Sequence, residues 1–379
     1  MMTISLMDLR EQYAVLRPDL DAALARVLDS GRFIGGPEVD AFNAEFAAYH
    51  GLPYALGCAN GTDALELALD ALGVGRGDEV IVPASSWIST SEVVATRGAT
   101  PVFVDVDDYH CLDPTGTAAA LTDRTRAVIV VHLYGHPADL TALTALCERH
   151  DLPLIEDCAQ SHGARWRGQR TGTFGRAGTF SFFPSKSLGA FGDAGAVVTD
   201  DTDLHERMRA LANHGMFGRR HVHQVHGRNS RLDALQAAVL RAKLPHLDDW
   251  IAAKNRAAAG YRERLSALDL AANDLEAPPV HADAYHGYHL FVVQSDRRDA
   301  LGEFLGRQGI ATSVHYPTPL PMHECYAAAG HRPEAFPRAV RLSERALSLP
   351  MFAELTEAQL DYVTDRIGAF FKSSATATP

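Results

Sequence analysis

Apolar runs rich in β-branched residues alternate with helical patterns between about residue 55 and residue 240 of the chain. The apolar runs predict strands at residues 79–82, 101–106, 127–132, 152–157, 178–183 and 194–199. Helical periodicity lies between several of these runs, as at residues 62–72 and 140–149. Such alternation predicts an α/β fold, in which helices flank a mostly parallel central sheet.

The pattern changes on both sides of this region. Helices are predicted at residues 10–30 and 38–49, and a long Ala/Leu-rich helix from residue 233 through 250 to 268 leaves the large domain. Beyond it, strand signals at 289–293 and 312–315 mix with helices at 300–308 and 357–371. We therefore predict an N-terminal segment with the large domain (1–244), a smaller C-terminal α+β domain (245–372) and a disordered tail (373–379).

Composition narrows the class of protein. The chain has 379 residues, too many for one small core, and its 46% hydrophobic and 22% charged residues are typical of a soluble globular protein. A net charge of −12 argues against general binding of nucleic acid or anionic membranes. Five cysteines without a C-x-x-C pair indicate reduced thiols. With neither a signal peptide nor a membrane-length apolar run, the sequence predicts a cytoplasmic protein.

A lysine stands between an aromatic segment and a glycine-rich loop. Lys186 ends the motif Ser-Phe-Phe-Pro-Ser-Lys that begins at Ser181, and a glycine-rich run follows as far as Gly195. A lysine amine attacks an aldehyde well only when desolvation or nearby cations lower its pKa from about 10.4. Such a lysine can hold an aldehyde cofactor as a Schiff base. The alternative is a surface lysine at the end of a strand.

A carboxylate and an amide follow an earlier strand. Asp157 lies at the end of the predicted strand 152–157, and Gln160 is three residues further on. Pyridoxal phosphate (PLP) needs a lysine for its aldehyde and an acid for its ring nitrogen. Asp157 suits the ring nitrogen and Gln160 the ring oxygen, although Asp157 could instead cap a turn. Together with Lys186 they make a PLP enzyme the leading hypothesis.

Two weaker signals fit the same cofactor. The turn around Gly61 runs into a helix, so the amides of Thr62 and Asp63 and the hydroxyl of Ser181 could hold a phosphate. The competing interpretation is that Asn60 or Thr62 simply caps the helix. Trp87 follows a strand, and its ring either stacks on the cofactor or fills the core.

Histidines gather in two places. His214, His221, His223 and His226 lie in one loop that we expect to contact an anionic ligand or another subunit, and we predict no metal because a helical H-E-x-x-H motif is missing. His315 follows the predicted strand 312–315, with His323 close behind. Each of these two either meets a substrate phosphate or lines a turn.

Taken together, these motifs resemble the DegT/StrS family of sugar aminotransferases, which have the type I fold of PLP-dependent transferases. The matching segments are residues 31–39, 60–65, 77–81, 132–135, 156–160, 181–186, 229–233 and 315–317. Three residues depart from the family's frequent choices: Cys158 stands for Ala, Ser187 for Asn and Ala194 for Gly.

The resemblance implies a role for each matching residue. Lys186 would carry the internal aldimine, Asp157 would face the ring nitrogen, Gln160 would lie near the ring oxygen, and Trp87 would stack on the ring. The phosphate would be held by Gly61, Thr62, Asp63 and Ser181, with Asn229 reaching in from a neighbouring subunit. The last role implies a homodimer with shared active sites.

The resemblance also implies the reaction. An amino group, usually from L-glutamate, would pass through pyridoxamine phosphate to the keto sugar of a nucleotide diphosphate sugar, with Lys186 moving the protons. Arg231, His315, Tyr316 and His323 are the candidates for binding that substrate. The Ser-Phe-Phe-Pro-x-Lys motif resembles members that act at C3 of the sugar more than those that act at C4.

Two alternatives follow from the same fold. Sugar dehydratases of the family have a histidine in place of the lysine, so Lys186 argues against them. A non-catalytic regulatory or binding protein would have no use for Lys186, Asp157 and Gln160 together.

Overall fold

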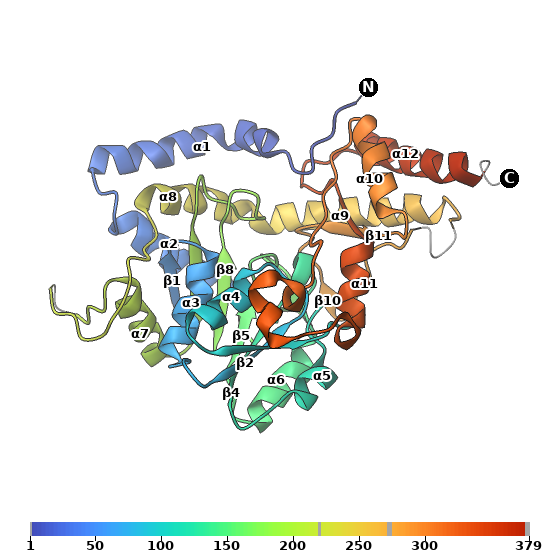
Figure 1. Ribbon diagram of the computed structural model, residues 1–379. Coiled ribbons are helices and arrows are strands. Elements are labelled where there is room, and N and C mark those ends of the chain that lie inside the picture. Colours follow the sequence, from blue (N-terminus) through green and yellow to red (C-terminus); the bar gives the residue numbers. More distant parts are fainter. Residues whose placement is uncertain (1, 219–220, 271–274, 376–379) are drawn as a thin grey trace.

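The computed structural model describes residues 2–218, 221–270 and 275–375 (Figure 1). Its helices are α1 (Leu9–Ser30), α2 (Pro37–His50), α3 (Gly61–Ala71), α4 (Ser89–Thr96), α5 (Pro114–Ala119), α6 (Leu140–Arg149), α7 (Thr202–Ala212), α8 (Ala234–Lys243), α9 (Leu247–Ser266), α10 (Arg298–Arg307), α11 (Pro337–Arg345) and α12 (Glu357–Ala375). Its strands are β1 (Tyr54–Cys58), β2 (Glu79–Pro83), β3 (Thr100–Val104), β4 (Thr125–Val131), β5 (Leu154–Asp157), β6 (Arg165–Trp166), β7 (Gln169–Arg170), β8 (Ala177–Ser181), β9 (Gly195–Thr199), β10 (Ala284–Tyr285), β11 (Phe291–Gln294) and β12 (Ala346–Leu349). No helix in these described ranges is both long and apolar enough to cross a membrane.

Seven strands form the central sheet, in the order β1-β9-β8-β5-β4-β2-β3. Strands β8, β5, β4, β2 and β3 pair in parallel, while β9 runs antiparallel to both β8 and β1. The carboxyl ends of the parallel strands therefore meet at one edge of the sheet, where open α/β folds bind ligands. This confirms the predicted α/β class.

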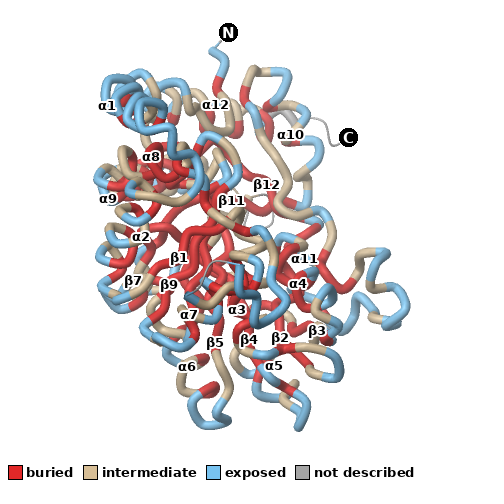
Figure 2. The backbone as a smooth tube through the Cα atoms, turned by 90° about the vertical axis from the view of Figure 1, so that its left-hand side faces the viewer, coloured by how far each residue is buried: buried red, intermediate tan, exposed pale blue. Residues whose placement is uncertain are grey.

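Apart from the edge strand β3, whose first three residues are partly exposed, the strands of this sheet are buried on both faces, which explains their continuous apolar sequence (Figure 2). Alternate residues of β2 point to opposite sides. Val80 and Val82 pack in the core with α3 and α4, whereas Ile81 packs in the core with α6. A third cluster lies between α2, α8 and the strands β8 and β9.

These three clusters make up the core of the large domain, and a separate core lies in the C-terminal part of the chain. The antiparallel pair β11–β12 packs with α10, α12 and the last part of α9. Ile4 joins this core and bridges Ile310, so the first residues belong with the small domain and not, as predicted, with the large one.

Helix α9 connects the two cores. Ile251 near its start packs in the large-domain cluster, and Leu265 near its end packs in the small-domain cluster. The change of core thus falls inside α9, several residues after the predicted boundary at 244/245. The long helix predicted from residue 233 is broken at Leu244–His246, a 3-10 turn containing Pro245, because proline lacks the amide that a helix interior needs.

The large-domain strands lie within a few residues of their predicted positions, but other elements differ. The pattern did not predict β1. Residues 312–315 form no strand in the described chain: Ser313 makes one isolated bridge to Ser348. Helix α12 continues through Ala375, three residues into the predicted tail, and residues 376–379 lie outside the described ranges.

Candidate cofactor site

A cavity of about 620 Å³ opens at the carboxyl edge of the central sheet. It is reached from the ends of β2, β5 and β8 and from the start of α3. Most of the predicted site residues line it, namely Gly61, Thr62, Asp63, Trp87, Asp157, Gln160, Ser181, Lys186, His315 and Tyr316.

Asp157 is the last residue of β5 and is buried at the floor of the cavity. Its Oδ1 accepts the amide of Ala159 (3.1 Å), and its Oδ2 accepts the hydroxyl of Thr90 (3.1 Å). Burial raises the pKa of this carboxyl above its usual value, because the charged form loses water. A cation placed against Asp157, such as a protonated ring nitrogen, would favour the charged form.

Lys186 lies half-buried at the wall of the cavity. Desolvation lowers the pKa of its amine to about 8, with Asp157 as the opposing influence. Its segment turns tightly: the Lys186 amide donates to the Phe183 carbonyl (2.8 Å). A Cβ on Gly189 would stand 2.3 Å from the carbonyl oxygen of Pro184, so the turn requires glycine at that position.

Gln160 has an orientation fixed by its neighbours. Its Oε1 accepts the amide of Tyr134 (2.7 Å), and its Nε2 donates to the hydroxyl of Tyr316 (3.0 Å). An amide nitrogen carries two protons, so one remains for an acceptor in the cavity.

The start of α3 closes one end of the cavity. Asn60 caps the helix, accepting the amide of Asp63 on its side chain (2.8 Å), so the capping interpretation is correct for Asn60. The Asp63 amide is therefore not the free donor that was expected. A Cβ on Gly61 would come within 2.6 Å of the Cβ of Ser181, so the helix approaches β8 this closely because residue 61 is glycine. Thr62 and Ser181 both face the cavity.

Trp87 stands at the rim of the cavity and is 57% exposed, so the core-filling interpretation is wrong. Its ring centre lies 5.7 Å from that of Tyr316, at an interplanar angle of 47°. Two aromatic side chains thus flank the opening.

Three predicted residues lie outside this cavity. Asn229 and Arg231 bind each other instead, through Nε of Arg231 and Oδ1 of Asn229 (3.0 Å). His323 follows the 3-10 turn Leu320–Met322 and does not line the cavity either.

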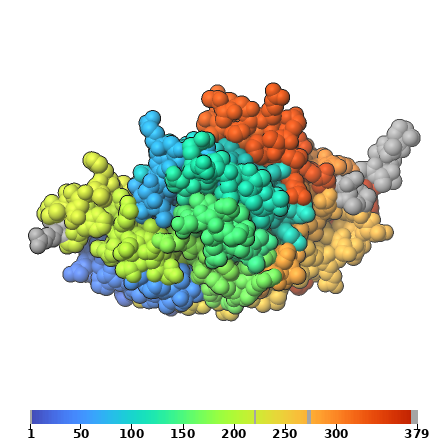
Figure 3. Space-filling view, turned by 90° about the horizontal axis from the view of Figure 1, so that it is seen from below, coloured from blue at the N-terminus to red at the C-terminus, as the bar shows by residue number. Residues whose placement is uncertain are grey.

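The segment with the histidine-rich loop lies at one end of the molecule (yellow-green in Figure 3), beside α7 (Figure 1). His214, His221, His223 and His226 are exposed, and Nδ1 of His223 lies 2.7 Å from the carbonyl oxygen of His214.

Over the described part of the chain, the one group of side chains with metal-ligand spacing is elsewhere: His132, Glu156 and Cys158, all buried.

Glu156 in that group already has its partners. It lies 3.1 Å from Nε2 of His132 and accepts the amides of Gly172, Phe174 and Gly175 (2.7–2.8 Å). These bonds hold the turn after β7 against β5, which is a structural role.

Sequence reasoning missed three residues of the site. Thr90 and Ser86, whose hydroxyls lie 2.9 Å apart, extend the hydrogen-bond chain from Asp157. His289 lines the cavity, and burial lowers its pKa well below the usual value, so its imidazole is neutral. The serines and threonines on both sides of Trp87 were a usable signal for the first two. His289 was hidden in an apolar strand pattern.

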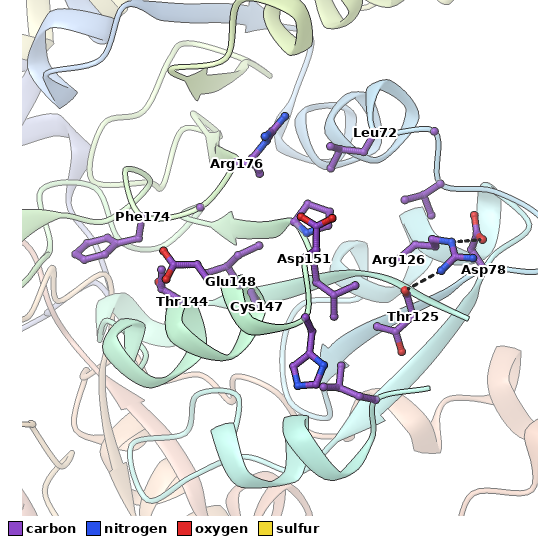
Figure 4. Close-up of a pocket in the computed structure, with 18 of the residues that line it drawn as sticks. Leu72, Asp78, Thr125, Arg126, Thr144, Cys147, Glu148, Asp151, Phe174 and Arg176 are labelled. Atoms are coloured by element: carbon purple, nitrogen blue, oxygen red, sulfur yellow. Dashed lines mark hydrogen bonds and ion pairs between the residues drawn. The ribbon is translucent and has the colours of Figure 1, made fainter. Parts of the chain in front are cut away.

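A larger cavity, of about 1240 Å³, lies at the opposite edge of the sheet, before the strands β2, β4 and β5 begin (Figure 4). Arg126 in its wall is paired with Asp78 (3.3 Å) and donates to the carbonyl of Thr125 (3.2 Å). Neither Lys186 nor Asp157 lines it, so the chemistry belongs to the smaller cavity.

The smaller cavity fits PLP. It offers an amine of lowered pKa for the aldehyde, a buried carboxyl for the ring nitrogen and an amide for the ring oxygen. The close approach of Gly61 to Ser181 brings a helix N-terminus and a hydroxyl together, which suits the phosphate.

Comparison with known proteins gives the same picture. The model of the DegT/DnrJ/EryC1/StrS aminotransferase family matches residues 15–368. A pleiotropic regulatory protein of Geobacillus stearothermophilus is 44% identical over 376 residues, which cover 99% of this chain and 100% of that one. A UDP-N-acetyl-3-dehydro-α-D-glucosamine 3-aminotransferase of Acidithiobacillus ferrooxidans is 47% identical over 358 residues, covering 94% and 95%.

A solved structure has the same fold over almost the whole chain. It is DesV of S. venezuelae, in complex with a ketimine intermediate. Its TM-score is 0.94 at 45% identity, and the match covers 98% of this chain and 99% of that one.

Proposed function

Because the chain belongs to the DegT/DnrJ/EryC1/StrS aminotransferase family, we propose that it aminates the keto sugar of a nucleotide diphosphate sugar, at C3. The enzyme is an aminotransferase that uses PLP, and PLP supplies the electron sink for the transfer. The observation that carries the proposal is the pair formed by Lys186 and Asp157 in one buried cavity at the carboxyl edge of the sheet. The relative that acts on a 3-dehydro sugar supports C3.

Lys186 is the group that moves protons in this proposal. A general acid or base works best when its pKa is near the working pH, and the pKa of Lys186 is about 8. Its amine can therefore both take and return a proton near neutrality. His289 also lines the cavity, but burial holds its pKa well below the usual value, so Lys186 is the stronger base of the two.

The other cavity residues bind and orient. Asp157 would hold a positive ring nitrogen, and the Gln160 Nε2 proton that is not bound to Tyr316 would be available to the ring oxygen. Gly61, Thr62, Asp63 and Ser181, which line the cavity, would border the phosphate, and Trp87 would cover the ring and exclude water.

The proposal includes a homodimer with shared active sites. Trp87 and Phe183, both on the rim of the cavity, are exposed in the single chain, as are Phe33 and Ile34. Exposed apolar residues around a site indicate a covering surface. Asn229 binds Arg231 and does not line the cavity of its own chain. This position is compatible with a contact to the cofactor site of a neighbouring subunit. Sedimentation at micromolar concentration should give twice the chain mass of 41.0 kDa, and a monomer would contradict this part.

The substrate residues follow from position. His315 and Tyr316 line the cavity beside Trp87 and remain the candidates for the sugar end of the substrate. Arg231, next to Asn229, would supply a positive charge to the pyrophosphate in a neighbour's cavity. His323 stays a weaker candidate because it lies outside the cavity.

One relative is named as a regulatory protein, so a non-catalytic regulatory role is the second candidate function. An absorbance spectrum distinguishes the enzyme from a non-catalytic protein. We expect a visible absorbance band of bound PLP at about 420 nm, which L-glutamate abolishes and which the Lys186→Ala variant lacks. A chain that binds no PLP would contradict the enzyme assignment.

Substrate assays complete the test. UDP- and dTDP-linked 3-keto sugars should be aminated faster than their 4-keto isomers, with the amine traced from labelled glutamate by mass spectrometry. Preference for the 4-keto isomers would contradict the C3 assignment and leave the cofactor assignment unchanged.

A further inference from the structure

Lysine is rare in this chain, and its positions are unusual. Only four of the 35 basic residues are lysines, namely Lys186, Lys243, Lys254 and Lys372. Lys372 is exposed, as expected for a lysine. Lys243 and Lys254 are buried, at 1% and 7% exposure. A chain that uses arginine almost everywhere else therefore keeps two lysines inside the protein.

Both buried lysines bind the segment that directly follows Lys186. Lys254, in α9, donates through Nζ to the hydroxyl of Ser187 (3.0 Å). Lys243, at the end of α8, donates through Nζ to the carbonyl of Gly189 (2.5 Å). The two ammonium groups thus hold the first and third residues after the cofactor lysine.

The segment they hold has little freedom of its own. The Ala190 amide donates to the Phe182 carbonyl (2.8 Å), and Gly189 packs against Pro184 too closely for any side chain. Ser187, which stands where the resembling family often has asparagine, is buried. A fixed turn next to Lys186 leaves its side chain as the movable part.

The chemistry explains why these are lysines. Each acceptor is a single oxygen, and a compact ammonium on a flexible stem can reach one acceptor where a guanidinium would bring five donors to satisfy. Burying an ammonium is unfavourable, and desolvation lowers the pKa of both amines to about 8. Carboxylate Glu354 offsets part of this for Lys254. Two such costly groups at one turn indicate a role beyond packing.

We propose that Lys254 and Lys243 are positioning residues, which fix the turn from Ser187 to Gly189 and so hold Lys186 toward the cavity. The inference rests on the proposed role of Lys186. It adds a function for two residues that do not line the cavity.

The first experiment measures the rate at which the holoenzyme loses PLP on dilution, followed by visible absorbance, next to the melting temperature of the cofactor-free chain. Lys254→Met should lose the cofactor about tenfold faster, because one hydrogen bond from a charged group is removed. Its melting temperature should be equal or higher, because a buried ammonium is gone. A merely structural lysine would show the reverse: a lower melting temperature and an unchanged rate of loss.

Ser187→Ala removes the same bond from the other side and creates little risk of misfolding. It should lose PLP as fast as Lys254→Met, and the double variant should lose it no faster than either single variant, since both break one contact. Its melting temperature should fall, because the buried Lys254 ammonium stays without its acceptor. Lys243→Met should speed the loss independently. Lys372→Met, on the exposed lysine, is the matched control and should behave as wild type.

Two results would overturn the inference: wild-type cofactor loss in both Lys254→Met and Ser187→Ala, or fully additive effects in the double variant. A separate measurement tests the function beneath it. Borohydride reduction followed by peptide mapping should place the pyridoxyl group on Lys186. A label on Lys254 or Lys243 would instead overturn the proposed role of Lys186.

Discussion

The hydroxyl of Thr90 donates to Oδ2 of Asp157 across 3.1 Å, and the two residues are 67 positions apart in the sequence. Thr90 lies in α4 and Asp157 ends β5, so the bond ties a helix to the floor of the cavity. The Thr90 hydroxyl lies 2.9 Å from that of Ser86, which orients it. Asp157 is thereby held in place before any cofactor arrives.

Removing that hydroxyl should weaken cofactor binding. Thr90→Val keeps the shape of the side chain, but it leaves Oδ2 of Asp157 without its donor and raises the pKa of the carboxyl further. We expect PLP to bind about tenfold more weakly, as for a lost hydrogen bond to a charged group. Thr96→Val, on the exposed end of the same helix, is the control. Equal dissociation constants for both variants in an absorbance titration would show that Thr90 is dispensable.

The lowered pKa of Lys186 predicts the pH dependence of cofactor capture. Only the neutral amine attacks an aldehyde, and its pKa is about 8 because burial disfavours the ammonium. The rate of PLP capture by the cofactor-free chain should therefore rise with pH through about 8 and then level off. A free lysine amine should keep rising to about 10.4. A midpoint as high as that of the free amine, in stopped-flow absorbance, would mean that Lys186 is hydrated.

The same pKa has a consequence for stability, with a definite sign. Between pH 8 and about 10.4 the unfolded chain keeps the proton on Lys186 while the folded chain has lost it, so the free energy of unfolding rises with pH. Lys186→Met lacks this term. Its advantage in stability over the cofactor-free wild type should shrink across that window in urea unfolding. A constant difference would contradict the assignment.

Gly61 should not tolerate a methyl group. In Gly61→Ala the new Cβ would lie 2.6 Å from the Cβ of Ser181, and α3 would have to move away from β8. We expect a loss of about 1–3 kcal/mol in stability from overpacking, with weaker PLP binding. Gly306→Ala, in α10, meets nothing within 4 Å and should instead gain about 0.5–1 kcal/mol. Thermal unfolding of the two variants side by side would decide the point.

An arginine cluster away from the cavity should resist exchange for lysine. Arg170 stacks on the ring of Tyr49 at 3.8 Å and donates twice to Asp248 (3.0 and 2.8 Å). Arg170→Lys keeps the charge but loses the planar fork, so we expect a loss of about 1–2 kcal/mol in urea unfolding. Arg17→Lys, in an exposed pair with Asp21, should change stability by less than about 0.5 kcal/mol. Similar losses in both would argue against the stacked geometry.

Local patterns in the sequence were enough for the strands that carry the site, because parallel strands buried on both faces are continuously apolar. Lys186 and Asp157 follow such strands, and so their meeting at one edge could be predicted. The end of the long helix could not be read from its Ala/Leu periodicity, although Pro245 marks the break.

Contacts between segments that are distant along the chain could not be predicted from the sequence. Nothing near Thr90 indicates that β5 lies beside it, and His289 looks like one more strand residue. The strand expected at 312–315 also failed for this reason: Ser313 makes one bridge to Ser348 and the pairing goes no further, and residues 312–315 are only half-buried. In the dimer that we propose, Asn229 and Arg231 would serve a neighbouring chain, and a single sequence does not show where that chain lies.

Helix α9 has a mechanical consequence. Its 20 residues span about 30 Å, with Ile251 embedded in one core and Leu265 in the other. Lys254, which grips Ser187, sits near the end fixed in the large domain. Most of the helix therefore lies toward the small domain. If that domain tilted when substrate bound, the rigid helix would shift Lys254 and, through its hydrogen bond, the turn at Ser187 next to Lys186. Substrate binding and the orientation of the Lys186 amine would then be coupled through α9.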